Sequence, residues 1–341
     1  MAETKKAVLV TGATGLIGSH LCAKLLMKGE KLNLLCRKGA DKSRLEKVIY
    51  SYLKDDMNVL SDIRFVEGNI CDYYSLLEAM EGVDRVYHCA GIVDFDDSNQ
   101  KEIMRINSEG TANVVNACLE KGVSLLSHVS SVAVFSDSKN ETVTENIFWK
   151  SSSTNSAYAI SKYNAEREVW RGKEEGLNII IVNPALVIGP GCYGKGSGEL
   201  IEQAVKGFPF YTSGSTGIVD VRDVVSCMLL LEEKKHFGQR FILCSENISF
   251  KKLFTNLNEA FLKSEPKIGL GYRALRILSY AEKLILVPFG GKRRLSRAAV
   301  SSATASKSFS SEKFLAACSH VFIPFEDSIK ETCDFYKKNV L

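Results

Sequence analysis

Two residues in the chain, Tyr158 and Lys162, have types and a spacing that suit proton transfer. Positions i and i+4 share one face of a helix, so the ammonium of Lys162 can stand beside the phenol of Tyr158. A free tyrosine has a pKa of about 10, and a nearby cation favours the phenolate and brings that pKa toward neutrality. The pair therefore indicates a general acid or base.

A glycine-spaced turn, Thr11-Gly-Ala-Thr-Gly-Leu-Ile-Gly18, lies near the start of the chain. It stands between a predicted buried strand at 6–11 and a segment with helical periodicity at 16–27. Gly12 permits a tight turn, Gly15 lets the backbone approach a pyrophosphate, and Gly18 permits close helix packing. The helix N-terminus adds N–H groups and a positive dipole. The turn predicts a dinucleotide site, although its three-and-three spacing is a variant of the usual fingerprint.

Both motifs, with their order and separation, resemble the extended short-chain dehydrogenase/reductase superfamily. Ser131 matches the catalytic serine of that family and Asn107 its asparagine. Tyr87-His-Cys-Ala-Gly91 is similar to the strand end that backs the adenosine and the nicotinamide ribose. The segments 183–191 and 219–224 resemble two later landmarks, in the form found in the dihydroflavonol reductase, aldehyde reductase and hydroxysteroid dehydrogenase branch.

The resemblance implies a catalytic set and two groups of binding residues. Tyr158 would donate a proton to a carbonyl oxygen as hydride reaches the carbon, and Ser131 would steady the same oxygen, with Ser130 as the alternative if the register is shifted by one. Lys162 would also hold the nicotinamide ribose, and Asn107 would have a structural or water-relay role. The substrate-lining residues implied are Val93, Asp94, Phe95 and Asn183. The cofactor-binding residues implied are Gly12, Thr14, Gly15, Leu16, Ile17, Arg37, Lys38, Asn69, Ile70, Cys89, Ala90, Gly91, Tyr158, Lys162, Pro184 and Val187.

The choice of cofactor depends on the end of the second predicted strand. Enzymes selective for NAD usually carry an acidic residue there, which binds the ribose 2′-OH and repels a 2′-phosphate. Here Cys36 takes that place and two cations, Arg37 and Lys38, follow it. A guanidinium offers a planar pair of donors to a phosphate, so we expect NADP, with NAD as the alternative if Arg37 only stacks on the adenine.

The elements that must position these residues alternate between strand and helix to about residue 245. This pattern predicts an α/β fold with a Rossmann-type doubly wound parallel sheet and a smaller, mainly helical C-terminal substrate lobe. We expect a dinucleotide-binding domain at 1–184, with a returning segment at about 219–245. The substrate lobe would then comprise 185–218 and 246–341. A serine-rich stretch at 296–311 could be a loop or a short strand pair. The expected strands lie at 6–11, 32–36, 63–66, 85–89, 125–130, 178–183 and 240–243.

Composition argues against several other classes of protein. The 44 basic and 40 acidic residues are too balanced to require nucleic acid, and the ten cysteines and five histidines show no metal-ligand spacing. Reduced core thiols and the lack of room for a signal peptide before the first strand predict a cytoplasmic protein. A near match to a triphosphate-binding loop at 189–196 fails because Gly196 replaces the hydroxyl residue and Pro190 removes a donor. We expect a mobile flap over the substrate there instead.

Association with membranes or with a second copy is harder to predict. The segment 272–289 is apolar but interrupted by charges, so we expect no transmembrane segment. It could pack on the substrate lobe, or lie on a membrane surface with the help of Lys292-Arg293-Arg294. Relatives often dimerise through helices that correspond to 98–121 and 157–174, so we expect a homodimer.

These observations favour an NADP-dependent carbonyl reductase or alcohol dehydrogenase that acts on a small molecule. Dehydratases of the superfamily carry Thr-Asp-Glu at the serine position, whereas Val132 and Ala133 follow Ser131 here. Epimerases usually carry an arginine where this chain has Asn183. The alternatives are an NAD-dependent nucleotide-sugar epimerase and a cofactor-binding regulator without turnover, although regulators usually lose the tyrosine and lysine.

Overall fold

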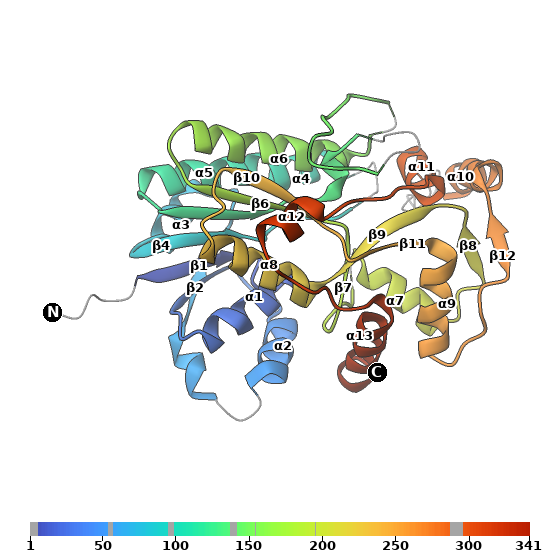
Figure 1. The fold of residues 1–341 in the computed structure, drawn as a ribbon, viewed down its shortest axis with the longest axis horizontal. Coiled ribbons are helices and arrows are strands. Elements are labelled where there is room, and N and C mark those ends of the chain that lie inside the picture. Colours follow the sequence, from blue (N-terminus) through green and yellow to red (C-terminus); the bar gives the residue numbers. More distant parts are fainter. Residues whose placement is uncertain are drawn as a thin grey trace.

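A parallel sheet of seven strands forms the centre of the molecule (Figure 1). The computed structural model describes residues 6–53, 57–94, 99–136, 142–153, 155–194, 196–286 and 296–341. The strand order is β10-β6-β5-β4-β1-β2-β3, so the chain winds outward in both directions from the β1–β4 pair. The Rossmann-type sheet expected from the sequence is confirmed. Its strands are β1 (Ala7–Thr11), β2 (Leu32–Cys36), β3 (Ile63–Glu67), β4 (Val83–His88), β5 (Leu125–Val129), β6 (Ile179–Pro184) and β10 (Gln239–Leu243).

Helices cover both faces of the sheet (Figure 1). The inner strands of the sheet are buried on both sides, as in β1, where Val8, Leu9 and Val10 have no exposed surface. Such strands require a cover on each face. One face carries α1 (Leu16–Met27), α2 (Ser43–Leu53) and α8 (Val221–Glu233). The other carries α3 (Tyr73–Ala79), α5 (Gly110–Glu120) and α6 (Ala157–Glu174).

A smaller group of elements lies beyond one end of the sheet. Three strands, β7 (Leu186–Ile188), β9 (Ser215–Asp220) and β11 (Glu246–Ser249), form a second sheet, and β8 (Phe210–Thr212) pairs with β12 (Ile268–Leu270). Ile201, Leu257 and Phe325 share a core there. They belong to α7 (Gly198–Val205), α9 (Phe250–Ala260) and α13 (Phe325–Asn339). The division into a nucleotide domain and a substrate lobe stays a prediction.

The C-terminal part of the chain returns to the main sheet before it ends. In α12 (Glu312–Ala317), Phe314 has no exposed surface and its ring centre lies 6.5 Å from that of Phe241 in β10. Upstream, the serine-rich stretch that we expected to be a loop or a strand pair contains α11 (Arg297–Thr304). The side chain of Ser296 explains this helix, because its hydroxyl accepts a hydrogen bond from the Ala299 N–H and caps the first turn.

The segment 272–289, which is apolar but interrupted by charged residues, contains an amphipathic helix, α10 (Tyr272–Leu286). Leu275 and Ser279 are buried, whereas Ile277, Leu278 and Tyr280 are exposed. The basic run 292–294 lies outside the described residues. Within the described part of the chain, no helix combines the length and apolar character needed to cross a bilayer. Contact with a membrane surface and a homodimer both stay predictions.

Candidate functional site

The turn between β1 and α1 is built around its glycines. Gly12 has a φ of +72°, and a Cβ there would lie 2.6 Å from the Ala90 nitrogen. A Cβ on Gly18 would lie 2.2 Å from the Gly12 carbonyl oxygen, so the helix packs directly on the turn. At Gly15 the nearest atom to such a Cβ is the Gly12 oxygen, at 3.1 Å. The turn leads directly into the N-terminus of α1, where the pyrophosphate of NAD or NADP is expected to bind.

The ends of β1 and β4 are joined beside this turn. The Cys89 N–H donates to the Thr11 carbonyl at 3.1 Å, and the Thr11 hydroxyl lies 2.7 Å from His88 Nδ1. The other ring nitrogen of His88 lies 2.9 Å from the Thr111 hydroxyl. Burial lowers the pKa of His88 to about 3, so this histidine is a neutral structural link. It holds Cys89, Ala90 and Gly91 against the glycine turn.

Ser131 and Tyr158 meet at the end of β5. Ser131 directly follows the strand region and caps a short 3-10 helix, η4 (Val132–Val134), by accepting a hydrogen bond from the Ala133 N–H at 3.1 Å. Ser131 also hydrogen-bonds the phenol of Tyr158, which acts to lower the pKa of that group. Burial acts more strongly in the opposite direction and holds the pKa of Tyr158 above its ordinary value. The phenol therefore keeps its proton at neutral pH.

Lys162 lies one helical turn from Tyr158 and is almost fully buried, with 5% of its surface exposed. Its ammonium donates to the Val129 carbonyl at 2.7 Å. Burial lowers the pKa of Lys162 to about 8. We expected Lys162 to lower the pKa of Tyr158, and this was wrong for the protein as described. The ammonium is directed to the end of β5, and burial dominates the environment of the phenol.

Asn107 fixes the loop that follows β4. It lies in a π-helix, η3 (Arg105–Glu109), between α4 (Gln100–Met104) and α5. Its amide donates to the Ile92 carbonyl at 2.9 Å and to the Ser161 hydroxyl at 2.9 Å, and its carbonyl oxygen accepts from the Ile92 N–H at 2.8 Å. With 2% exposed surface, Asn107 connects this loop to α6.

The expected adenosine-binding residues lie at the ends of β2 and β3. Arg37 and Lys38 are exposed directly after β2, whereas Cys36 is buried. The side-chain oxygen of Asn69 accepts a hydrogen bond from the Cys71 N–H at 3.0 Å. Ile70 is buried and packs on Gly110, where a Cβ would lie 2.7 Å from its Cδ1. Of this group, only the cations present charge to the solvent.

The remaining expected cofactor residues are distributed along the same edge of the sheet. Thr14 lies in the glycine turn, and Leu16 and Ile17 begin α1. Pro184 ends β6, and Val187 lies in β7. The glycine turn follows the carboxyl end of β1, and residues 89–91 follow that of β4. Ser131 lies just after β5, and Pro184 ends β6.

The expected substrate-lining residues that the structure describes lie in different environments. Val93 is 42% exposed, and a Cβ on Gly196 would lie 3.7 Å from the Val93 Cβ. Asp94 accepts a hydrogen bond from Asn99 at 2.7 Å, and Phe95 lies outside the described residues. Asn183 differs from our expectation. It has no exposed surface and donates to the Ser131 carbonyl at 3.2 Å, so it supports the serine from behind.

The glycine-rich segment after β7 packs on α2. Arg44 of α2 donates to the Gly191 carbonyl at 3.1 Å and to the Thr14 carbonyl at 3.4 Å. Its guanidinium also lies 4.5 Å from the centre of the Tyr193 ring. Arg44 therefore joins this flap to the glycine turn. Local sequence patterns could not indicate this contact, because Arg44 and Gly191 are 147 positions apart.

A buried carboxylate, Glu166, was also missed from the sequence. It lies four residues after Lys162 on α6, is 3% exposed and pairs with Arg240 of β10 at 3.0 Å. The spacing from Lys162 was a signal that could have drawn attention to Glu166. No local pattern could have identified its partner on a distant strand.

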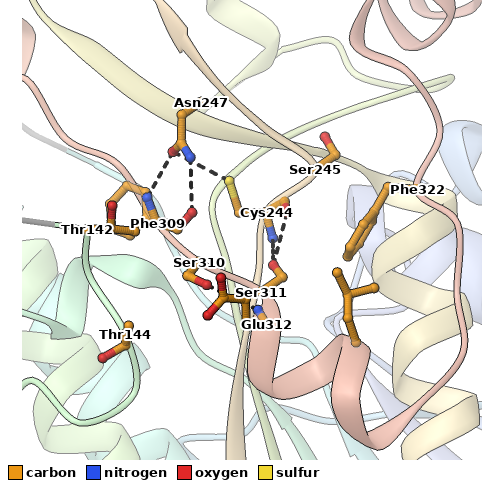
Figure 2. Close-up of a pocket in the computed structure, with 11 residues that line it drawn as sticks. Thr142, Thr144, Cys244, Ser245, Asn247, Phe309, Ser310, Ser311, Glu312 and Phe322 are labelled. Atoms are coloured by element: carbon orange, nitrogen blue, oxygen red, sulfur yellow. Dashed lines mark hydrogen bonds between the residues drawn. The ribbon is translucent and has the colours of Figure 1, made fainter.

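A hollow of about 420 Å³ lies elsewhere, between the β10–β11 connection and the returning C-terminal chain (Figure 2). None of the expected site residues lines it. Figure 2 shows Asn247 bonded to the Phe309 backbone and Ser311 bonded to the Cys244 backbone. These polar groups hold the returning chain in place. In the described ranges, no group of three or more potential metal ligands gathers in one place.

Comparisons with known proteins agree with this arrangement. The family model of the NAD dependent epimerase/dehydratase family matches residues 8–243. The chain is 30% identical over 254 residues to cinnamoyl-CoA reductase 1 of Petunia hybrida, covering 71% of this chain and 73% of that one. It is 27% identical over 277 residues to sterol demethylase protein B of Methylococcus capsulatus, covering 79% and 78%.

Solved structures share the fold over nearly the whole length. The crystal structure of gox2253 is 28% identical, covers 98% of this chain and 99% of its own, and superposes with a TM-score of 0.81. UDP-glucose 4-epimerase of Thermus thermophilus in complex with NAD, at 20% identity, covers 98% and 100% with a TM-score of 0.72. The expected type of enzyme, an NAD(P)-dependent oxidoreductase of the extended short-chain dehydrogenase/reductase type, is confirmed. The chain belongs to the NAD dependent epimerase/dehydratase family.

Proposed function

We propose that this protein is an NADP-dependent carbonyl reductase or alcohol dehydrogenase with Ser131, Tyr158 and Lys162 at its centre. The observation that carries the proposal is the hydrogen bond between Ser131 and Tyr158 beside a buried Lys162. Relatives named cinnamoyl-CoA reductase 1 and putative dihydroflavonol 4-reductase support reduction of a carbonyl group. Structures of epimerases, at about 20% identity or less, support the fold alone.

In this proposal each side chain has a defined task. The nicotinamide, when bound, supplies or accepts the hydride. Tyr158 gives its proton to the substrate oxygen, and the Ser131 hydroxyl donates a hydrogen bond to the same oxygen as negative charge develops there. Because burial raises the pKa of Tyr158, the phenol carries its proton at neutral pH and is ready to donate it. Lys162 supplies a positive charge beneath the site.

The proposed preference for NADP depends on Arg37 and Lys38. Both are exposed directly after β2, next to the glycine turn, and Cys36 supplies no carboxylate. A 2′-phosphate would gain charge-assisted hydrogen bonds there, whereas a 2′-OH would gain little. No observation on the described residues specifically favours a nucleotide-sugar substrate.

Measurement of turnover tests the proposed reductase function directly. The purified protein should oxidise NADPH in the presence of members of a panel of aldehydes and ketones. Tyr158→Phe should lower this activity by at least ~100-fold, the usual scale for loss of a general acid, while NADPH still binds. Near-normal reductase activity of the variant would remove Tyr158 from the mechanism. Epimerisation of a UDP-sugar without net NADPH consumption would replace the reductase proposal by the epimerase alternative.

A further inference from the structure

Three consecutive residues at the end of β5 are each held by a side chain from a neighbouring element. Lys162 donates to the Val129 carbonyl at 2.7 Å. The Ser130 hydroxyl donates to Glu166 Oε2 at 2.8 Å, and Asn183 donates to the Ser131 carbonyl at 3.2 Å. These contacts fix the backbone at the end of β5 and with it the position of Ser131. The Ser131 hydroxyl hydrogen-bonds Tyr158.

Glu166 connects these contacts. Its carboxylate accepts four hydrogen bonds, so both oxygens are fully used. Two go to Oε2, from Ser130 at 2.8 Å and from Asn183 at 2.9 Å. Two go to Oε1, from Arg240 at 3.0 Å and from the Trp170 indole at 3.3 Å. Glu166 is 3% exposed, and a buried carboxylate is costly unless it is paired and hydrogen-bonded in this way.

The charge of Glu166 acts on Lys162. Burial disfavours the ammonium, whereas Glu166 and Cys89 favour it. The histidines that face Lys162 from β4 and β5, His88 and His128, are fully buried, and burial lowers the pKa of each. They are neutral and supply no compensating charge. Glu166 is thus the negative charge that supports the ammonium.

Arg240 has its own anchors, so it does not depend on Glu166 for its position. It donates to the Glu145 and Ile147 carbonyls at 2.7 and 3.3 Å and lies 4.5 Å from the centre of the Phe135 ring. The arginine brings β10, at the edge of the sheet, into contact with the carboxylate. The arrangement Lys162, Glu166, Arg240 alternates in charge from the site to the edge strand.

We propose that Glu166 is a positioning residue for the Ser131, Tyr158 and Lys162 site. It holds the end of β5 that carries Ser131, and it keeps the ammonium on Lys162. This inference rests on the proposed reductase function. A purely structural ion pair would stabilise the fold without changing turnover or its pH dependence, and this difference makes the two roles separable.

The first test compares Glu166→Gln with Glu174→Gln. Glu174 lies on the same helix, its side chain is 78% exposed, and its ion pair is with Lys173, at 3.7 Å. Glutamine at 166 cannot accept from four donors, so the strand end should shift and kcat should fall by ~10- to 100-fold. Loss of the negative charge should move the alkaline limb of the pH profile down by about one pH unit. The dissociation constant for NADPH should stay the same at about pH 6, where Lys162 keeps its ammonium in both proteins. Glu174→Gln should match wild type in all three measurements.

A second variant, Ser130→Ala, removes one donor but keeps the carboxylate. It should lower kcat by roughly 5- to 10-fold, the value of one lost hydrogen bond, and leave the alkaline limb where it is. This small change also serves if Glu166→Gln does not fold. In that case, an unchanged kcat for Ser130→Ala overturns the positioning role, and a lower kcat with unchanged NADPH affinity supports it.

The outcomes separate this inference from the proposed function. If Glu166→Gln folds and keeps wild-type kcat and pH profile while Tyr158→Phe is inactive, the positioning role is wrong and the reductase proposal stands. If Tyr158→Phe remains active, the reductase proposal fails and the role of Glu166 fails with it. A lower melting temperature for Glu166→Gln without any change in kcat or in the alkaline limb identifies a structural ion pair only.

Discussion

At the scale of single residues, the site combines groups whose pKa values are well separated. Burial raises the pKa of Cys89 to about 12 and lowers that of His88 to about 3. It also raises the pKa of Tyr158, and it brings that of Lys162 to about 8. Of these four groups, Lys162 alone titrates in the range between neutrality and pH 10. A change of activity in that range therefore reports on its ammonium.

The pH dependence of turnover follows from this separation. The pKa of Lys162 lies near 8 in the cofactor-free protein, so the ammonium is present below that pH and is lost above it. The quantity kcat/KM for NADPH, which reports on the free enzyme, should be level below about pH 8. Above that pH it should fall by about tenfold per pH unit. A profile that stays level through pH 10 would show that the ammonium is not required.

We expect Arg37 to set the preference between NADP and NAD. Removing its contacts to a 2′-phosphate should cost ~1.5–3 kcal/mol. Arg37→Ala should therefore weaken NADPH by roughly 10- to 150-fold and leave NADH nearly unaffected, as measured by fluorescence titration. Arg64→Ala, at an exposed position of β3, serves as the control and should change neither constant. A wild-type protein that already prefers NADH would contradict the assignment.

Some roles of single residues could be predicted from the sequence and others could not. The proximity of Ser131 and Tyr158 was implied by the resemblance of their motifs to those of the superfamily. Asn183 was expected to line the substrate site, but it donates to the Ser131 carbonyl behind that site. The contact between Glu166 and Arg240 joins residues 74 positions apart, and local periodicity carries no information on such pairs.

At the scale of elements, two glycines of the turn between β1 and α1 have different roles, one in cofactor binding and one in folding. Gly15 has an extended backbone, with φ −80° and ψ 173°, which any residue can adopt. The space above it is the space expected for a pyrophosphate. Gly18, by contrast, faces the Gly12 carbonyl so closely that a side chain would collide with backbone. Substitution of Gly15 should therefore affect cofactor affinity, whereas substitution of Gly18 should affect stability.

A pair of variants shows this difference. Gly15→Val should leave the protein folded and sharply weaken NADPH, because a branched side chain occupies the expected path of the pyrophosphate. Gly18→Ala should instead lower stability by about 1–3 kcal/mol, since the turn and the helix must move apart. Thermal unfolding and NADPH titration of both proteins provide the measurements. Unchanged affinity in Gly15→Val would place the nucleotide elsewhere.

The strands of the main sheet could be predicted because each is a short apolar run between turn residues, and such runs are local. The returning chain could not. Residues 306 and 309 form isolated bridges with Ser215 and Val143, and these partners lie about 91 and 166 positions away in sequence. Serine-rich sequence by itself specifies neither a helix nor a strand, so α11 emerged only from its cap and its packing.

At the scale of the whole molecule, the site lies at the carboxyl edge of the sheet, next to the β1–β4 pair from which the chain winds both ways. This is the position at which doubly wound sheets bind ligands. The C-terminal chain closes back on the same sheet through α12 and through the Ile323 N–H, which donates to Asp223 at 2.8 Å. The last forty residues thus pack on the main sheet and its helices as well as on the smaller group of elements.

The packing of α12 on the main sheet leads to a prediction for stability. Phe314 has no exposed surface and packs near Phe241, His320 and Phe322. Phe314→Ala should lower the free energy of unfolding by ~3–5 kcal/mol, measured in urea. Phe148→Ala, at a residue that is 79% exposed, should change it by less than about 0.5 kcal/mol. If Phe314→Ala unfolded at the wild-type urea concentration, the returning chain would not be part of the main core.

The π-helix at Arg105–Glu109 has a consequence for how the molecule tolerates changes in length. It contains one more residue per turn than the α-helices on either side, so Asn107 can face Ile92 and Ser161 while Val114, Val115 and Cys118 of α5 face the sheet. Each residue of an α-helix advances its direction by about 100° around the axis. Deletion of Ser108 would therefore turn one end of this helix relative to the other by that angle. Either Asn107 would lose its hydrogen bonds to Ile92, or the apolar residues of α5 would turn away from the core. Both sets of contacts can form only while the extra residue is present.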